Sequence, residues 1–118
     1  MTRYLLDTNA VIALLNNAES PFARRVRQHK PADICISSIV AHELFYGAFK
    51  SQRAESNVAI ADSLPFEVLE FDKEDARRAG QVRAYLALKG TPIRPYDVLI
   101  AGQAQARSMT LAQATLTS

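Results

Sequence analysis

Three carboxylate residues, Asp7, Glu43 and Asp97, are the side chains of this sequence whose types and positions best suit chemistry. They lie far apart along the chain, so only the fold can bring them together. Carboxylates that converge repel one another and raise one another's pKa unless a cation neutralises their charge. Hard cations such as Mg²⁺ or Mn²⁺ prefer oxygen ligands. If the three acids meet, they therefore predict a divalent metal site.

Each acid also has a structural explanation. Asp7 can accept N–H groups at the start of a helix, and Asp97 can complement the positive end of a helix dipole. Glu43 can be a solvated helix residue, although its apolar neighbours Ile39 and Leu44 disfavour this. For any one acid alone the structural explanation is favoured, whereas the three together favour the metal site.

A carboxylate–metal site suits the hydrolysis of phosphodiester bonds. One ion, or a pair roughly 4 Å apart, can stabilise charge on the attacking and leaving oxygens. No serine or cysteine nucleophile with a histidine base is evident, which argues against acyl transfer. Phosphoryl transfer through an aspartyl intermediate at Asp7 is disfavoured, because haloacid-dehalogenase-like enzymes need a second Asp where Asn9 stands.

The composition predicts one cytoplasmic domain over residues 1–118, with an atypical part at about 110–118. Hydrophobic residues make up 48%, enough for a packed core. No apolar run reaches the roughly 20 residues of a membrane span, and no secretory signal is evident. Cys35, the only cysteine, lies in an apolar run and is expected to be a core side chain. His29 and His42 lack the partners of a zinc site.

The net charge of +2 is a mild basic bias, compatible with nucleic acid. Basic residues gather in two runs, one from Arg24 to Lys30 and one at Arg77 and Arg78. Such runs are usually solvated helix faces. Only clustering on one surface would make them a track for phosphates.

The elements that must position the acids alternate between strand and helix. Short apolar runs predict strands, and capping residues followed by helical periodicity predict helices. In chain order, we expect a strand at 4–6, helices from about 8 to 16 and from 21 to about 29, a strand at 34–36, helices at about 39–50 and 54–64, a strand at 66–71, helices at about 73–90 and 96–107, and a last strand at 109–116.

Particular residues mark the ends of these helices. Thr8 or Asn9 can cap the first helix. Asp72 with Asp75 resembles a capping box for the helix that begins at about residue 73, and Gly90 suits the left-handed position after its last turn.

Strands alternating with helices imply right-handed crossovers and a parallel sheet covered on both faces. In such sheets, ligands bind beyond the carboxyl ends of the strands. That rule directs attention to Asp7, to the segment 37–43, and to the residues after Thr91.

Three segments resemble the signature segments of VapC-type PIN-domain toxins. These are residues 5–9 (LLDTN), 37–47 (SSIVAHELFYG) and 90–97 (GTPIRPYD). Residues 79–84 (AGQVRA) are also similar to the family's helix before the third segment. The resemblance covers Met1 to about Thr110, in order and at ordinary spacing.

The resemblance implies a three-layer α/β/α sandwich around a mainly parallel sheet of four to five strands. It also implies homodimerisation, a VapB-like antitoxin, and Mg²⁺- or Mn²⁺-dependent endoribonuclease activity on structured RNA, often transfer RNA. In that family, the acids matching Asp7, Glu43 and Asp97 hold the metal and do the catalysis. Thr8 or Asn9 helps to arrange the loop of the first acid, and we expect Ser38 to support the site.

Two departures from the family pattern matter. The family usually has glycine where Arg94 stands, and the arginine either reaches the acidic pocket and competes with metal or points to solvent as a phosphate contact. Metal affinity before and after Arg94→Gly separates these alternatives. The relatives' threonine–asparagine-rich motif after the last predicted strand is also missing, and no Asp or Glu follows Asp97. The chain thus looks truncated or altered here, and the alternative function is a catalytically weakened toxin that only dimerises and binds antitoxin.

Overall fold

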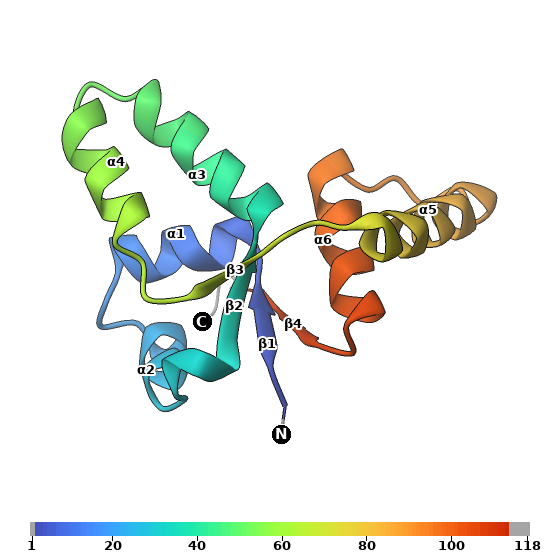
Figure 1. Cartoon of the computed structure of the whole chain (residues 1–118), viewed down its shortest axis with the longest axis horizontal. Coiled ribbons are helices and arrows are strands. Elements are labelled where there is room, and N and C mark those ends of the chain that lie inside the picture. Colours follow the sequence, from blue (N-terminus) through green and yellow to red (C-terminus); the bar gives the residue numbers. More distant parts are fainter. Residues whose placement is uncertain (1, 114–118) are drawn as a thin grey trace.

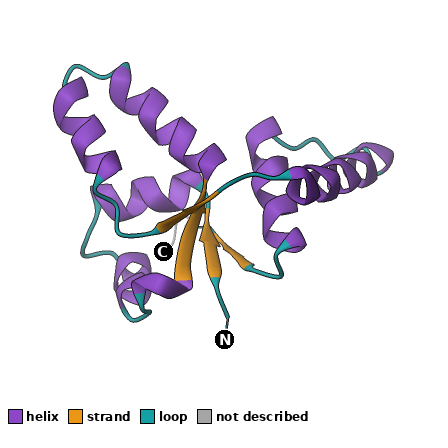
Figure 2. Cartoon of the chain, in the orientation of Figure 1, coloured by secondary structure: helices purple, strands orange, loops and turns teal. Residues whose placement is uncertain are grey.

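The computed structural model of the chain describes residues 2–113, and its elements follow the predicted alternation of strand and helix (Figure 2). The elements are β1 (Tyr4–Leu6), α1 (Thr8–Asn16), α2 (Pro21–Arg27), a 3₁₀ turn (Pro31–Asp33), β2 (Ile34–Ser37), α3 (Ser38–Phe49), α4 (Ala54–Asp62), β3 (Glu67–Leu69), α5 (Lys73–Leu88), α6 (Pro95–Ala106) and β4 (Thr110–Ala112). No helix in the described part of the chain is both long enough and apolar enough to cross a membrane.

The four strands form one parallel sheet in the order β3-β2-β1-β4. Helices α1 to α4 lie on one side of the sheet, and α5 and α6 lie on the other (Figure 1). Right-handed crossovers explain this division of the helices. The strands are added in one direction across the sheet from β1 to β3, and the chain then crosses back over the sheet to place β4 on the other side of β1. The predicted α/β fold with a parallel sheet is confirmed.

The core is formed by strand residues that are covered on both faces. Leu5, Leu6, Cys35 and Ile36 are each at most 2% exposed, as expected for the strands of a parallel sheet with helices on both sides. Val40 of α3 packs into the same cluster. The prediction that Cys35 is a core side chain is confirmed.

Two local predictions need correction, and one short turn was not predicted. The strand predicted at 66–71 is paired only at residues 67–69, because beyond Leu69 the N–H of Phe71 donates to the Ser38 hydroxyl instead of to a strand. The cap of α1 is Asp7, not Thr8 or Asn9. The 3₁₀ turn at 31–33 was not predicted. Of the predicted last strand, residues 110–112 are paired, and residues 114–116 lie outside the described part.

Both ends of α5 are built as predicted. Asp72 and Asp75 form the capping box, with each side chain accepting the other's backbone N–H at 2.9–3.0 Å. At the other end, Gly90 has a φ of 66°. The Thr91 N–H then donates to the Leu86 carbonyl at 3.0 Å, which closes the helix.

Helices α5 and α6 pack closely at Gly102. A Cβ atom built on Gly102 would lie 2.4 Å from the Ala79 Cα and 2.6 Å from its Cβ. No side chain fits there unless the helices move apart, so this contact fixes the spacing of α5 and α6.

We expect Gly102→Ala to lower the free energy of unfolding by about 1–3 kcal/mol, because the added methyl group overpacks the contact with Ala79. Urea denaturation measures this. Gly80→Ala is the matched control, since a Cβ there meets nothing within 4 Å. A helix gains about 0.5–1 kcal/mol when such a glycine becomes alanine. Equal effects of the two substitutions would contradict the packing role of Gly102.

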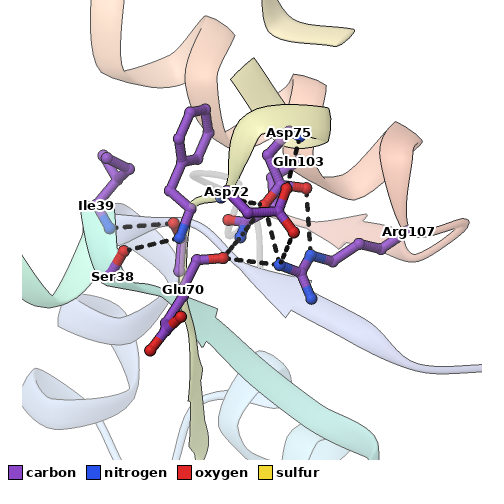
Figure 3. Close-up of polar contacts among 9 residues, drawn as sticks. Ser38, Ile39, Glu70, Asp72, Asp75, Gln103 and Arg107 are labelled. Carbon is purple, nitrogen blue, oxygen red and sulfur yellow. Dashed lines mark hydrogen bonds and ion pairs between the residues drawn. The ribbon is translucent and has the colours of Figure 1, made fainter. Parts of the chain in front are cut away.

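A buried carboxylate joins the same two helices. Asp75 of α5 is 1% exposed and accepts hydrogen bonds from Gln103 and Arg107 (Figure 3). Burial by itself raises the pKa of Asp75, but the hydrogen bond and charge of Arg107, the Asp72 N–H and Gln103 outweigh it and lower the pKa. The ionised carboxylate therefore stabilises the fold.

This lowered pKa predicts a stability that falls in acid. Asp75 binds a proton more weakly when folded than when unfolded, so its contribution is present above the unfolded pKa of about 3.9 and is lost as the pH falls through the folded value. Urea denaturation between pH 7 and pH 3 should show that Asp75→Asn is less stable than wild type at pH 7 but loses less stability in acid. Parallel pH curves for the two proteins would exclude this linkage.

Candidate functional site

Asp7 directly follows β1, one of the two inner strands, at the carboxyl edge of the sheet. Its Oδ1 accepts the N–H of Ala10 at 2.8 Å and so caps α1. Its own N–H donates to the Ala112 carbonyl of β4 at 3.3 Å. Because the chain turns to opposite faces of the sheet around β1, Asp7 stands at the switch point where parallel α/β sheets bind ligands.

Glu43 reaches the same end of the sheet from α3. The Thr8 hydroxyl, in the first turn of α1, donates to Glu43 Oε1 at 2.6 Å. This bond joins α1 to α3 and holds the Glu43 carboxylate beside the residue that follows Asp7. The predicted supporting role of Thr8 thus acts on the second acid, whereas Asn9 is exposed.

Asp97 approaches from the opposite side of the sheet, in the first turn of α6. Helix α6 precedes β4 and runs antiparallel to it, so its N-terminal turn lies at the carboxyl edge of the sheet. There the carboxylate also complements the positive end of the helix dipole. The structural explanations considered for Asp7 and Asp97 are therefore compatible with a shared site.

The charges of Asp97 and Glu43 both act on Asp7. Its pKa is raised, first by partial burial and then by the negative charges of Asp97 and Glu43. The Ala10 N–H and a hydrogen bond from the Gln113 side chain act in the opposite direction but do not cancel the shift. A cation placed among these carboxylates would relieve the repulsion.

The donor set fits a hard divalent ion, because the three acids, Thr8 and Gln113 offer oxygen atoms. Within residues 2–113, no group of three or more His, Cys, Asp or Glu side chains is gathered closely enough to hold a metal ion.

Gln113 is the site residue that the sequence did not reveal. It directly follows β4, whose Ala112 is paired with Leu6 of β1, so Gln113 stands beside Asp7 at the edge of the sheet. The parallel register is the signal that could have identified it, since residues after paired strands meet at one edge.

Two other predicted residues lie at the edges of this arrangement. The Ser38 hydroxyl accepts the Phe71 N–H at 3.3 Å, so it joins the start of α3 to the segment after β3. Arg94 is the exposed N-cap residue of α6. In the described part of the chain, its guanidinium group forms no hydrogen bond or ion pair, so its effect on metal stays a prediction.

The two basic runs do not form one track. Arg24, Arg25 and Arg27 belong to α2, whereas Arg77 and Arg78 belong to α5. Helices α2 and α5 lie on opposite sides of the sheet (Figure 1). Each run therefore remains a separate solvated helix face.

A groove of about 380 Å³ opens next to Glu43, between α1, α3 and α4. Its walls are largely apolar. Ile12 and Leu15 come from α1, Leu44 from α3 and Ile60 from α4. Ile12, Leu15 and Ile60 are each more than 40% exposed, so this groove is an uncovered apolar surface that leads to one of the three acids.

Comparison with known proteins gives a consistent set of relatives. Residues 4–115 match the family described as PIN domain. The chain is 41% identical over 113 residues to the "tRNA(fMet)-specific endonuclease VapC" of Salmonella typhimurium, covering 94% of this chain and 85% of that protein. It is 37% identical to the protein of the same name from Shigella flexneri, with the same coverage of both chains.

Solved structures resemble the fold equally well. A chain of the DNA-bound VapBC of Salmonella typhimurium superposes with a TM-score of 0.89 at 40% identity, covering 96% of this chain and 86% of that one. A chain of VapBC2 of Rickettsia felis bound to a promoter DNA fragment gives a TM-score of 0.86 at 32% identity, covering 93% and 85%.

We expect Asp7→Asn to stabilise the metal-free protein. Asparagine caps a helix as well as aspartate does, but it removes the charge that Asp97 and Glu43 repel. At pH 7 in EDTA, urea denaturation should show a gain of about 0.5–2 kcal/mol, the range common for such relief. Asp7→Ala, which also loses the cap, should show a smaller gain or a loss. A less stable Asp7→Asn protein would show that the repulsion is negligible.

Proposed function

This chain belongs to the PIN-domain family, as a VapC-type toxin, and on that premise we propose that it is a metal-dependent endoribonuclease that hydrolyses structured RNA. The observation that carries the proposal is that Asp7, Glu43 and Asp97 lie at the same edge of the sheet, where partial burial and then the charges of Asp97 and Glu43 raise the pKa of Asp7. A cation placed among these acids would offset the repulsion between their charges.

Asp7, Glu43 and Asp97 are the residues that would hold Mg²⁺ or Mn²⁺. When bound, such an ion supplies positive charge for the scissile phosphate and acidifies a water molecule. The chain's own part is to fix the acids. The cap of α1 orients Asp7, the Thr8 hydroxyl orients Glu43 at 2.6 Å, and the first turn of α6 orients Asp97. Gln113 adds an amide beside Asp7.

The substrate that we propose is transfer RNA. Two relatives that match 94% of this chain are named tRNA(fMet)-specific endonucleases, so tRNA(fMet) is the first RNA to test. With transfer RNA as the substrate, we propose that the protein acts in the cytoplasm.

A VapB-like antitoxin is the proposed partner. The solved relatives are VapBC complexes. In this chain, the apolar groove between α1, α3 and α4 suits apolar side chains of such a partner, and it ends at Glu43. An antitoxin segment in the groove would therefore lie against the acids that hold the metal. Ile60→Asp places a charge in the groove and should weaken antitoxin binding. Unchanged binding would show that the antitoxin does not bind in the groove.

A second copy of this chain has a separate surface available. His42, Tyr46 and Phe49 recur along one side of α3, and the rings of His42 and Tyr96 meet edge to face at 6.0 Å. Tyr46 and Phe49 are more than 60% exposed, and Ile93 lies just before α6. Burial of this aromatic face in a homodimer would remove it from water. Sedimentation equilibrium gives the mass that decides this.

The purified chain should cut tRNA(fMet) at discrete positions in the presence of Mg²⁺ or Mn²⁺. Cleavage should fall by at least about 100-fold in EDTA and in Asp7→Asn, because each change removes transition-state stabilisation of several kcal/mol. Gel analysis of end-labelled RNA measures this. Arg77→Gln, an exposed change on α5, is the control. Folded protein that binds antitoxin but cuts no RNA would support the alternative of a catalytically weakened toxin.

A further inference from the structure

The candidate metal site requires that two helices on opposite sides of the sheet keep a fixed position relative to each other. Glu43 is carried by α3 and Asp97 by α6. Asp7 directly follows a strand of the sheet, whereas the positions of Glu43 and Asp97 depend on the positions of their helices. The structure joins α3 and α6 directly, through the rings of His42 and Tyr96, and also through a short segment, residues 70–72, that follows β3.

On the α6 side, this segment is bound by two side chains. The Arg107 Nη2 donates to the Glu70 carbonyl at 2.7 Å, and the Gln103 Nε2 donates to the same carbonyl at 3.1 Å (Figure 3). Arg107 also bonds both Asp75 carboxylate oxygens, at 3.2 and 3.0 Å, and Gln103 bonds one of them at 3.1 Å. The end of α6 is thereby attached to the segment and to the start of α5 together.

On the α3 side, the next residue of the segment makes the connection. The N–H of Phe71 donates to the hydroxyl of Ser38, the first residue of α3, at 3.3 Å (Figure 3). Adjacent residues of one strand end thus bind α6 through a carbonyl and α3 through an N–H. The contacts run from Arg107 and Gln103 to Ser38, which lies in the same helix as Glu43.

We propose that Arg107 and Gln103 are positioning residues of the metal site, which set where Asp97 lies relative to Glu43. This inference rests on the proposed function, because it assigns these residues to the site that holds the ion. They act through α6 and the 70–72 segment and do not touch the metal.

The chemistry of the network favours a role in positioning the helices over a role in stability alone. Asp75 and Gln103 are at most 1% exposed, and Oε1 of Gln103 has no hydrogen-bond partner among the described residues. Buried ion pairs are often no more stabilising than apolar side chains of the same volume. Their hydrogen bonds are directional, however, and the paired bonds of an arginine to a carboxylate fix both distance and angle. The close contact of Gly102 with Ala79 also fixes the distance between α5 and α6.

The test is Mn²⁺ affinity by titration calorimetry in wild type, Arg107→Met, Arg107→Lys and Arg3→Met. Arg3→Met is the matched control, because the Arg3 guanidinium also bonds a carboxylate and a backbone carbonyl, but at the start of β1. We expect affinity to fall by about 10-fold in Arg107→Met, in line with the loss of other residues that orient metal ligands. Arg107→Lys should recover part of it, and Arg3→Met should match wild type.

Hydrogen exchange provides a readout without metal. Amides in the first turn of α6 should exchange faster in Arg107→Met than in Arg3→Met, while those of α1 should not differ. Gln103→Met, which keeps the volume of the side chain, replaces Arg107→Met if that variant does not fold.

Each outcome has one meaning. An Mn²⁺ site that is lost in Asp7→Asn but is indifferent to Arg107 and Gln103 would overturn the positioning role alone. Equal losses in Arg107→Met and Arg3→Met would also overturn it, because they would reflect general destabilisation. A wild-type protein without Asp7-dependent Mn²⁺ binding would overturn the proposed function itself, and the positioning role with it.

Discussion

The parallel pairing of β1 with a strand on each side is the constraint on which the site depends. Leu6 is opposite Ile36 on one side and Ala112 on the other. Because the strands are parallel and in register, the residues that follow them meet at one edge. Strands β2 and β3 are added on one side of β1 and β4 on the other, so the connecting helices cover both faces of the sheet. Side chains from both helix layers can therefore reach the edge where Asp7 lies. Helix propensity and local capping alone could not bring these side chains to one edge of the sheet.

The acids remain together because each has a local anchor that does not depend on the others. Asp7 caps α1, Glu43 accepts the Thr8 hydroxyl, and Asp97 stands at the positive end of α6. In each anchor a hydrogen-bond donor or the positive end of a helix dipole lies beside the carboxylate, which offsets part of the mutual repulsion. The site thus keeps some unfavourable repulsion between like charges within a stable fold, as is common at functional sites.

Helices on both sides of the sheet pack on the apolar core, to which α6 contributes Ile100 and Ala104, but the side of α5 and α6 also has a buried polar network. Helices α1 to α3 contribute Val11, Phe22 and Val40 to the apolar core. Helices α5 and α6 meet each other through the Gly102 contact and through the buried polar network around Asp75. Apolar packing tolerates small sliding, whereas directional hydrogen bonds do not. The difference suits a layer in which α6 must deliver one carboxylate to a defined place.

The sequence by itself determined the parts of this protein that local chemistry controls. Apolar runs gave the strands, Asp72 with Asp75 and Gly90 gave the ends of α5, and the three signature segments gave the family. Short-range hydrogen bonds and backbone preferences act over three or four residues, so they can be read directly from the chain.

Tertiary structure alone decided which distant groups meet. It placed Gln113 beside Asp7, bonded Thr8 to Glu43 across 35 residues, and joined Arg107 to Asp75 across 32. It also ended the β3 strand at Leu69, where a serine hydroxyl replaced a strand partner. These contacts depend on strand order and helix packing, which are properties of the whole fold and which no local pattern of residues encodes.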